Sequence, residues 1–314
     1  MTTPEIVELA RRARGLKEAG IALLISSGIL ALFLFIPLMP GHSQPVSASA
    51  TTTPKAPFIT APIEAKAAIV YDLATGETLY EKNADAQLPL ASLTKLLTVY
   101  AAVATLPSET PVTVSVEAAS AEAPQAFPVG TTFTLTDIAR LTLTASLNDG
   151  AVAIAQAAAH KRGLSTADTL AAAAAALGLH ETYALNGNGL DLSTAVSGGY
   201  GSARDVARLA GALVRHAPDI VRATTEETAR ATSAEGSVYR VKNTDPMTSV
   251  IPRLLLSKTG FTDLAGGNLT LVFDAGIAHP VAVVVLGSSK DARFTDGLAL
   301  VASALAHFAG VAAL

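Results

Sequence analysis

The sequence contains no cysteine and no tryptophan, and aromatic residues make up only 5% of its 314 positions. Without cysteine, the chain can form neither disulfides nor thiolate-based catalytic sites. Charged residues are also few, at 15%, and the net charge of −4 provides no basic character of the kind that binds nucleic acid. The six histidines show no i, i+4 pair or other zinc-ligand spacing, so we expect no metal and no cofactor.

What the chain does have is a long apolar run near its amino end, residues 19–39, with no charge over 21 positions. That length is enough to cross a bilayer as a helix, and the cations within residues 11–17 favour a cytoplasmic amino end. We therefore expect a cytoplasmic tail at residues 1–18 and a single-pass membrane anchor at 19–39. The alternative is a cleaved signal peptide, because Ala48-Ser49-Ala50 has the small-x-small form of a processing site, although it lies far from the apolar run.

Residues 40–64 are rich in Pro, Ser, Thr and Ala, and we interpret them as an extended linker. Beyond them, two strand-like runs are joined at Ala74-Thr75-Gly76, which predicts a hairpin. The remaining elements follow in order: helical patterns from Ser92 to about Arg215, three strand-like runs between residues 253 and 287, and an apolar helix over 295–312. This order predicts an α/β (α+β) domain over residues 65–314, with one antiparallel sheet completed from both ends and flanked by helices.

Ser92 is the only serine with a lysine three positions later, and the pair lies in the apolar stretch PLASLTKLLTVYAAVATL. Residues i and i+3 share a helix face, and Pro89 suits a helix start just before them. A serine hydroxyl becomes nucleophilic when a base takes its proton, and neutral lysine can be that base. Free lysine is neutral in only about one molecule in 2,500 at pH 7, so burial of Lys95 would be needed to lower its pKa. By itself the pair is a weak signal, because about one is expected by chance in such a chain.

Two further short motifs follow. Ser146-Leu147-Asn148 fits a catalytic motif and an ordinary helix-capping loop equally well. Lys258-Thr259-Gly260 stands at the end of a predicted strand and is expected in fewer than about one chain in ten of this composition. In this order the three motifs match the set of the serine acyl-transfer enzymes of the penicillin-binding class. Lys258 would then be a second cation that lowers the pKa of Lys95.

With these motifs, the segment from Ala65 to Phe308 resembles the D-alanyl-D-alanine carboxypeptidases, the low-molecular-mass penicillin-binding proteins. The resemblance extends to NGNGLD, YGSARDVARLA, KNTDPM, KTGFTDLAGG and SSKDARFTDGLALVASAL. It implies a β-lactamase/transpeptidase-like fold with a helical lobe beside the sheet. It also implies peptidoglycan stem peptides as substrates, β-lactams as covalent inhibitors, and catalysis outside the cell membrane.

The resemblance assigns a role to each motif residue. Ser92 would be the acylated nucleophile, Lys95 its base and Ser146 a proton relay. The remaining residues would bind substrate: Asn148 the substrate amide, Lys258 and Thr259 the terminal carboxylate with Gly260 beside them, and the amide of Phe261 an oxyanion together with the amide of Ser92.

Two other functions stay open. A class A β-lactamase shares the motifs and needs a glutamate that activates water, and Glu181 lies five positions before Asn186, one more than that enzyme's pattern. We interpret Glu181 as a solvated residue after a helix. A non-catalytic penicillin-binding sensor would need a cytoplasmic signalling part, and only residues 1–18 precede the predicted anchor.

Overall fold

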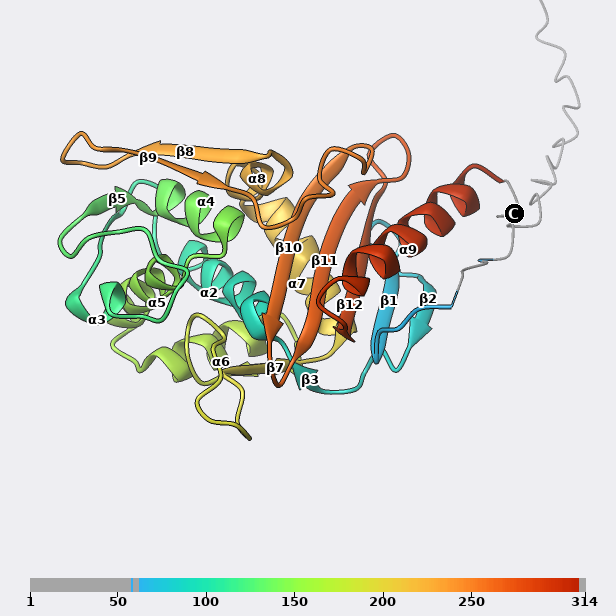
Figure 1. Cartoon of the computed structure of the whole chain (residues 1–314), viewed down its shortest axis with the longest axis horizontal. Coiled ribbons are helices and arrows are strands. Elements are labelled where there is room, and N and C mark those ends of the chain that lie inside the picture. Colours follow the sequence, from blue (N-terminus) through green and yellow to red (C-terminus); the bar gives the residue numbers. More distant parts are fainter. Residues whose placement is uncertain (1–57, 59–61, 311–314) are drawn as a thin grey trace, which may run out of the picture. The chain divides into compact units, whose positions relative to one another are not determined.

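A five-stranded antiparallel sheet organises the part of the chain that the computed structural model describes, namely Phe58 and residues 62–310 (Figure 1). Its strands lie in the order β10-β11-β12-β1-β2. Their bounds are β1 Ala67–Asp72, β2 Thr78–Lys82, β10 Leu254–Thr262, β11 Gly266–Asp274 and β12 Pro280–Ser288. Because β1 pairs with β12, with Ile69 opposite Val284, the early hairpin and the late strands form one sheet. The predicted antiparallel sheet is confirmed.

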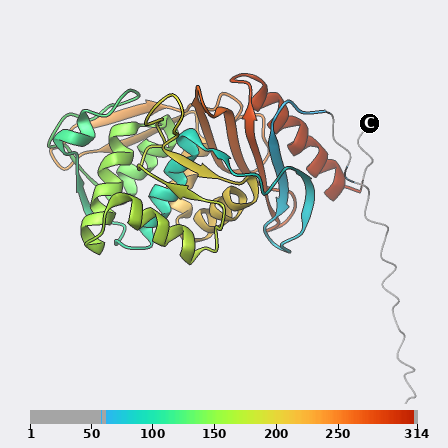
Figure 2. The same ribbon diagram turned by 90° about the horizontal axis from the view of Figure 1, so that it is seen from below.

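Both faces of the sheet are covered, which explains why its central strands are apolar at nearly every position. Alternate residues point to opposite faces. In β1, Ile69 joins the core shared with the helical lobe, whereas Val70 joins the core beneath α9 (Ala292–Phe308). In β12, Val284 and Val285 divide in the same way. Figure 2 shows the strands between α9 on one side and the other helices on the other.

The helical lobe is formed by the segment between β2 and β10. Its helices are α2 Thr94–Val103, α3 Val116–Ala119, α4 Leu135–Ala145, α5 Asn148–Arg162, α6 Thr166–Ala176, α7 Ala203–His216 and α8 Pro218–Arg222, with 3-10 turns η1 Ala91–Leu93 and η2 Ala223–Thr225. Side-chain oxygens of Thr134, Ser165 and Ser202 accept backbone N–H bonds at the starts of α4, α6 and α7. These caps satisfy amides that have no partner within the helix, so the helices begin where they do.

Several short strands were not predicted from the sequence. They are β3 Leu88–Pro89, β6 Tyr183–Ala184 and β7 Gly199–Gly201, the pair β4 Pro111–Thr113 and β5 Thr132–Thr134, and the hairpin β8 Thr228–Thr232 and β9 Val238–Lys242. With two to five residues each, they are too short for an alternating pattern to be recognised. The helical turn begins at Ala91, one residue before the predicted start at Ser92, and Pro89 pairs with Tyr200 in a strand just before it.

The last helix begins at Ala292 and ends at Phe308, so it starts and ends earlier than the predicted 295–312. The predicted tail, the membrane anchor and nearly all of the linker lie outside the described residues. Within Phe58 and residues 62–310, no helix is both long enough and apolar enough to cross a membrane.

Candidate active site

Ser92 lies in the 3-10 turn η1, and Lys95 lies one turn later at the start of α2. The Nζ atom of Lys95 is 2.8 Å from the Oγ atom of Ser92, so the predicted pair is in hydrogen-bond contact. Ala91, just before the serine, has a φ of 48°, a left-handed conformation that is uncommon for a residue with a Cβ. A Cβ on Gly189 would overlap the carbonyl oxygen of Ala91, so the glycine lets the neighbouring loop pack directly on this turn.

Lys95 is fully buried, and its Nζ atom donates to two acceptors, Ser92 Oγ and the backbone carbonyl of Asn188 at 2.7 Å. Burial lowers the pKa of Lys95 well below its ordinary value, and the positive charge of Lys258 lowers it further. The carboxylate of Asp149 acts in the opposite direction. The apolar stretch around Lys95 therefore favours the neutral amine, which is the form that can accept a proton from Ser92.

Lys258 lies in the middle of β10, not at a strand end as predicted from the sequence. The strand continues to Thr262 because it stays paired with β11, with Gly260 opposite Asn268. The buried Nζ atom of Lys258 donates to Ser146 Oγ at 2.9 Å and to the carbonyl of Thr259 at 2.7 Å. Burial lowers the pKa of Lys258 to about 7, with nearby Arg293 contributing and Asp245 opposing. The second and third motifs thus meet at one hydrogen bond.

Gly260 brings β10 against the backbone of η1. A Cβ on Gly260 would lie 3.0 Å from the carbonyl oxygen of Leu90 and 3.3 Å from the amide nitrogen of Ser92. These distances are shorter than most Cβ contacts, so the absence of a side chain on Gly260 lets the strand that carries the amide of Phe261 pass beside the amide of Ser92 without displacing it. The side chain of Phe261 is 41% exposed, and Lys290 lies over its ring at 5.4 Å from the centroid.

Three motifs in contact on this fold indicate a family, and the comparison with known families decides it. Residues 50–290 match the family described as D-alanyl-D-alanine carboxypeptidase, peptidase S11. The chain belongs to this family. It is therefore a hydrolase, a serine D-Ala-D-Ala carboxypeptidase, as the sequence resemblance implied.

Two relatives share 28% identity with the carboxypeptidase. A D-alanyl-D-alanine endopeptidase of Pseudomonas aeruginosa aligns over 278 residues, or 86% of each chain. The D-alanyl-D-alanine carboxypeptidase DacC of Escherichia coli aligns over 292 residues, or 87% of this chain and 66% of DacC.

Solved structures confirm the mixed α/β fold. A D-alanyl-D-alanine carboxypeptidase of Mycobacterium tuberculosis superposes with a TM-score of 0.67 at 24% identity, covering 80% of this chain and 92% of that one. Penicillin-binding protein D2 of Listeria monocytogenes, in its cefotaxime-bound form, superposes with a TM-score of 0.65 at 25% identity, covering 78% and 99%.

Asn148, which ends the second motif, is almost completely buried in the carboxypeptidase, as are Lys95 and Lys258. It begins α5, is only 1% exposed, and its Nδ2 atom donates to the carbonyl of Glu122 at 2.8 Å. Its Oδ1 atom has no hydrogen-bond partner among the described residues. The neighbouring Asp149 accepts the amides of Ala126 and Phe127, each at 2.7 Å, so both residues hold the loop that precedes the second motif.

Four further residues lie at or next to the motif residues and were not singled out from the sequence: three contact a motif residue, and Asp245 contacts Ser257 beside Lys258. The carbonyl of Asn188 accepts from Lys95, and Nη1 of Arg293 donates to the carbonyl of Gly260 at 2.6 Å. The hydroxyl oxygens of Thr244 and Thr259 are 2.6 Å apart, and Asp245 accepts from Ser257 at 2.5 Å. All four lie in the segments NGNGLD, KNTDPM and SSKDARFTDG, so the resemblance of those segments was the available signal.

No group of three His, Asp or Glu side chains within Phe58 and residues 62–310 is arranged to hold a metal ion.

Proposed function

We propose that this carboxypeptidase removes the terminal D-alanine of peptidoglycan stem peptides through an ester on Ser92. The observation that carries the proposal is the 2.8 Å contact between Lys95 Nζ and Ser92 Oγ, with the lysine buried and its pKa lowered. As Oγ attacks the carbonyl carbon of the last amide, neutral Lys95 takes the hydroxyl proton. The negative charge that develops on the carbonyl oxygen is met by the amides of Ser92 and Phe261, each such donor being worth roughly 3 kcal/mol.

The tetrahedral intermediate breaks down when the leaving nitrogen is protonated. We assign this transfer to Ser146, whose hydroxyl passes on the proton that Lys95 has taken, and which Lys258 holds at 2.9 Å. The carbon–nitrogen bond breaks, free D-alanine leaves, and the peptide stays on Ser92 as an ester. Water then attacks the ester, Lys95 accepts the water proton, and Ser92 Oγ leaves with a proton to restore the free enzyme.

The terminal carboxylate of the substrate would be bound by Lys258 and Thr259, and the penultimate amide by Asn148. A carboxylate next to Lys258 favours its charged form, so binding would raise a pKa that lies at about 7 without substrate. The two lysines thus have complementary tasks: Lys95 acts as the neutral amine and Lys258 as the cation.

A class A-like β-lactamase would use the same acylation step but needs a carboxylate that activates water. Glu181 is exposed; its backbone N–H donates to Asp205, and its backbone carbonyl accepts from Gln87. Asp149 is buried near Lys95, but its carboxylate oxygens accept the amides of Ala126, Phe127 and Gly150. We therefore propose that β-lactams acylate Ser92 and stay bound as inhibitors.

The test is to measure D-alanine release and penicillin hydrolysis with one preparation. We expect multiple turnovers on a peptide ending in D-Ala-D-Ala, while the penicilloyl ester on Ser92 persists for minutes or longer. Labelling by a fluorescent penicillin should be absent in Ser92→Ala. Rapid, repeated penicillin hydrolysis without D-alanine release would establish a β-lactamase instead, and binding without turnover of either compound would establish a sensor.

We further propose that the catalytic domain works outside the cell membrane, tethered by residues 19–39. The support is the charge-free apolar run and the cations before it. A reporter fused after Leu314 should be active only when it is outside the cytoplasm, and the mature protein should retain its amino end. Recovery of a chain that begins near Thr51 would show a cleaved signal peptide.

A further inference from the structure

The hairpin β8–β9 has three exposed cations on its outer face. Alternate residues of each strand point to opposite sides. Ala231 and Tyr239 face inward, where the ring of Tyr239 packs against two phenylalanine rings of the helical lobe. Arg230, Arg240 and Lys242 alternate with these inward residues and are exposed. The packing of the hairpin therefore explains its inner face but not the cations.

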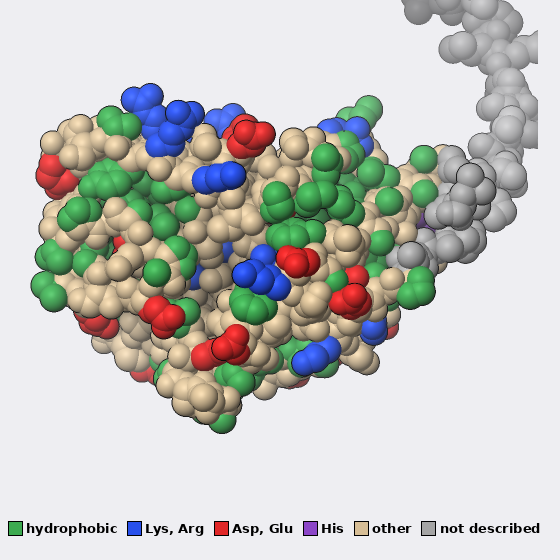
Figure 3. All heavy atoms as spheres, in the orientation of Figure 1, with side chains coloured by type: hydrophobic (Ala, Val, Ile, Leu, Met, Phe, Trp, Pro, Cys, Tyr) green, Lys and Arg blue, Asp and Glu red, His purple; other side chains and the backbone are tan. Residues whose placement is uncertain are grey.

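Pairing with acidic side chains does not explain them either. Arg230 and Arg240 stand directly opposite each other, where like charges destabilise an antiparallel pair. Across the described part of the chain, no carboxylate forms an ion pair with Arg230, Arg240 or Lys242. The chain as a whole is acidic, with a net charge of −4. Figure 3 shows Lys and Arg side chains gathered along its upper edge, where Figure 1 places β8 and β9.

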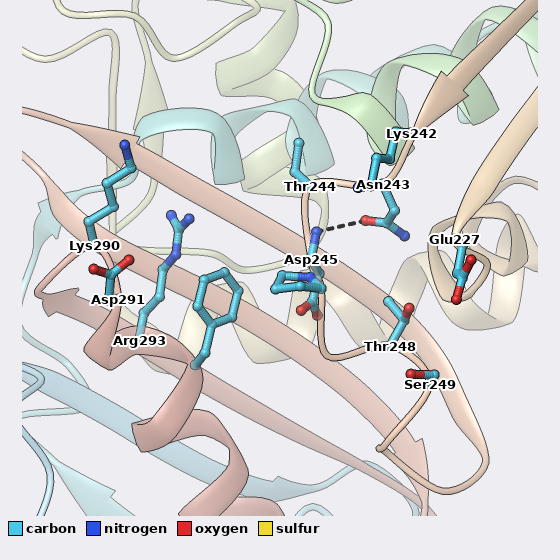
Figure 4. Close-up of a pocket in the computed structure, with 12 residues that line it drawn as sticks. Glu227, Lys242, Asn243, Thr244, Asp245, Thr248, Ser249, Lys290, Asp291 and Arg293 are labelled. Atoms are coloured by element: carbon cyan, nitrogen blue, oxygen red, sulfur yellow. Dashed lines mark hydrogen bonds between the residues drawn. The ribbon is translucent and has the colours of Figure 1, made fainter.

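The cationic face leads directly to the active site. Strand β9 ends at Lys242, and Thr244, two residues on, has its hydroxyl oxygen 2.6 Å from that of Thr259. Lys242 and Thr244 also line a pocket of about 490 Å³. Figure 4 shows Lys290 and Arg293 on the opposite side of this pocket from the segment Lys242 to Asp245. An anion held on the hairpin would therefore lie beyond Thr259, to which we assign the substrate carboxylate.

The pocket itself has mixed charge and more room than one leaving D-alanine needs. Its volume falls in the range of pockets that enclose small-molecule ligands larger than a single alanine. Glu227, Asp245 and Asp291 line it together with the cations. The carboxylate of Asp245 is already held by Ser257 at 2.5 Å. The pocket thus suits a peptide with polar groups of both signs, whereas the outer face of the hairpin suits carboxylates.

We propose that the outer face of β8–β9 and the adjoining pocket bind a second, carboxylate-bearing peptide strand of the polymeric cell-wall substrate, next to the strand being cut. This inference rests on the proposed function. Guanidinium groups bind carboxylates with two parallel hydrogen bonds, and exposed charge contacts weaken with salt. The surface therefore favours the polymer over a short peptide that ends at the scissile D-alanine.

The test compares two double variants on two substrates. Arg230→Gln/Arg240→Gln removes the opposed pair, and Lys161→Gln/Arg162→Gln is the matched control, because these two exposed cations lie in the last turn of α5. On purified peptidoglycan at low salt, kcat/KM should fall about three- to tenfold in the first variant only. The difference should shrink at high salt, and both variants should cleave a short D-Ala-D-Ala peptide within about twofold of the wild type.

Polymer kinetics equal to the wild type, or an equal loss on both substrates, would overturn the inference. Vesicles containing phosphatidylglycerol separate a lipid surface from a peptide strand: vesicle binding that is lost in Arg230→Gln/Arg240→Gln, with polymer kinetics unchanged, would assign this face to anionic lipid instead. Failure of the wild type to release D-alanine from the short peptide would refute the proposed function alone. In that case, co-sedimentation of Ser92→Ala with peptidoglycan, with and without the two arginines, still decides whether the surface binds the polymer.

Discussion

Replacement of Lys95 by methionine should separate the activity of this carboxypeptidase from its stability. Methionine is close to lysine in length but has no charge and no base, and Lys95 is fully buried. The variant removes an amine whose pKa is lowered by burial, so the free-energy cost of taking this ionisable group out of water is removed as well. It also removes two hydrogen bonds, to Ser92 Oγ and to the carbonyl of Asn188.

The expected magnitudes follow from these contacts. Leaving the carbonyl of Asn188 unpaired costs about 1–3 kcal/mol, and this cost is offset by removal of the buried amine. We therefore expect a melting temperature within about 6 °C of the wild type, since 1 kcal/mol shifts the transition by about 2–4 °C in a domain of this size. Loss of a general base lowers a rate by about 100- to 10,000-fold. Acylation by a fluorescent penicillin should fall by that factor.

A matched variant, Lys95→Arg, keeps the positive charge but cannot give it up, because arginine stays protonated. It should be as slow as Lys95→Met in acylation and less stable by roughly 3 kcal/mol or more, because its charge remains buried. Melting curves and single-turnover labelling of the two variants provide the measurement. Acylation of Lys95→Met within tenfold of the wild type would refute the assignment of the base, and equal melting temperatures for the two variants would refute the argument from burial.

Variants at three other positions test separate parts of the structure. Because the pKa of Lys258 is about 7 and carboxylate binding needs its charge, kcat/KM should fall above about pH 7 in a pH–rate profile, and Lys258→Arg should lack this decline. The unfolded chain binds more protons than the folded one between pH 7 and 10, so stability to urea should rise with pH in that window and rise less in Lys258→Met. Gly260→Ala should slow acylation at least tenfold without unfolding the protein, since its Cβ would meet the backbone of η1; an unchanged labelling rate would contradict the close approach. Asp296→Ala removes the acceptor of three hydrogen bonds near the start of β1. It should lower the free energy of unfolding by about 2–3 kcal/mol and leave kcat unchanged. A loss of kcat in the folded variant would contradict this purely structural role.

The sequence by itself determined the main sheet and the pairing of Ser92 with Lys95. The strands of the sheet are covered on both faces, so they appear as apolar runs that need no knowledge of their partners. The pairing of Ser92 with Lys95 depends only on the geometry of one helical turn, which places i and i+3 on the same side. The resemblance of three ordered motifs to one enzyme class was confirmed by the family to which the chain belongs.

Only the tertiary structure decided how these groups are arranged and charged. The pKa of Lys95 depends on its burial and on Lys258, which is more than 160 positions away in the chain and reaches it only through folding. The carbonyl of Asn188 is likewise brought to Lys95 from a distant loop. The pairing of β10 with β11 determines where β10 ends. The local sequence pattern therefore could not show that Lys258 lies in the middle of the strand.

The short strands and the left-handed turn at Ala91 have the same origin. A strand of two to five residues is stable only because a neighbour completes its hydrogen bonds, and the φ of 48° at Ala91 persists in a turn on which the loop containing Gly189 packs closely. Such features depend on contacts between segments that are far apart in the chain. The sequence therefore determined which polar groups the site contains, and the packing of β10 and the loop of Asn188 around η1 determined their geometry and protonation.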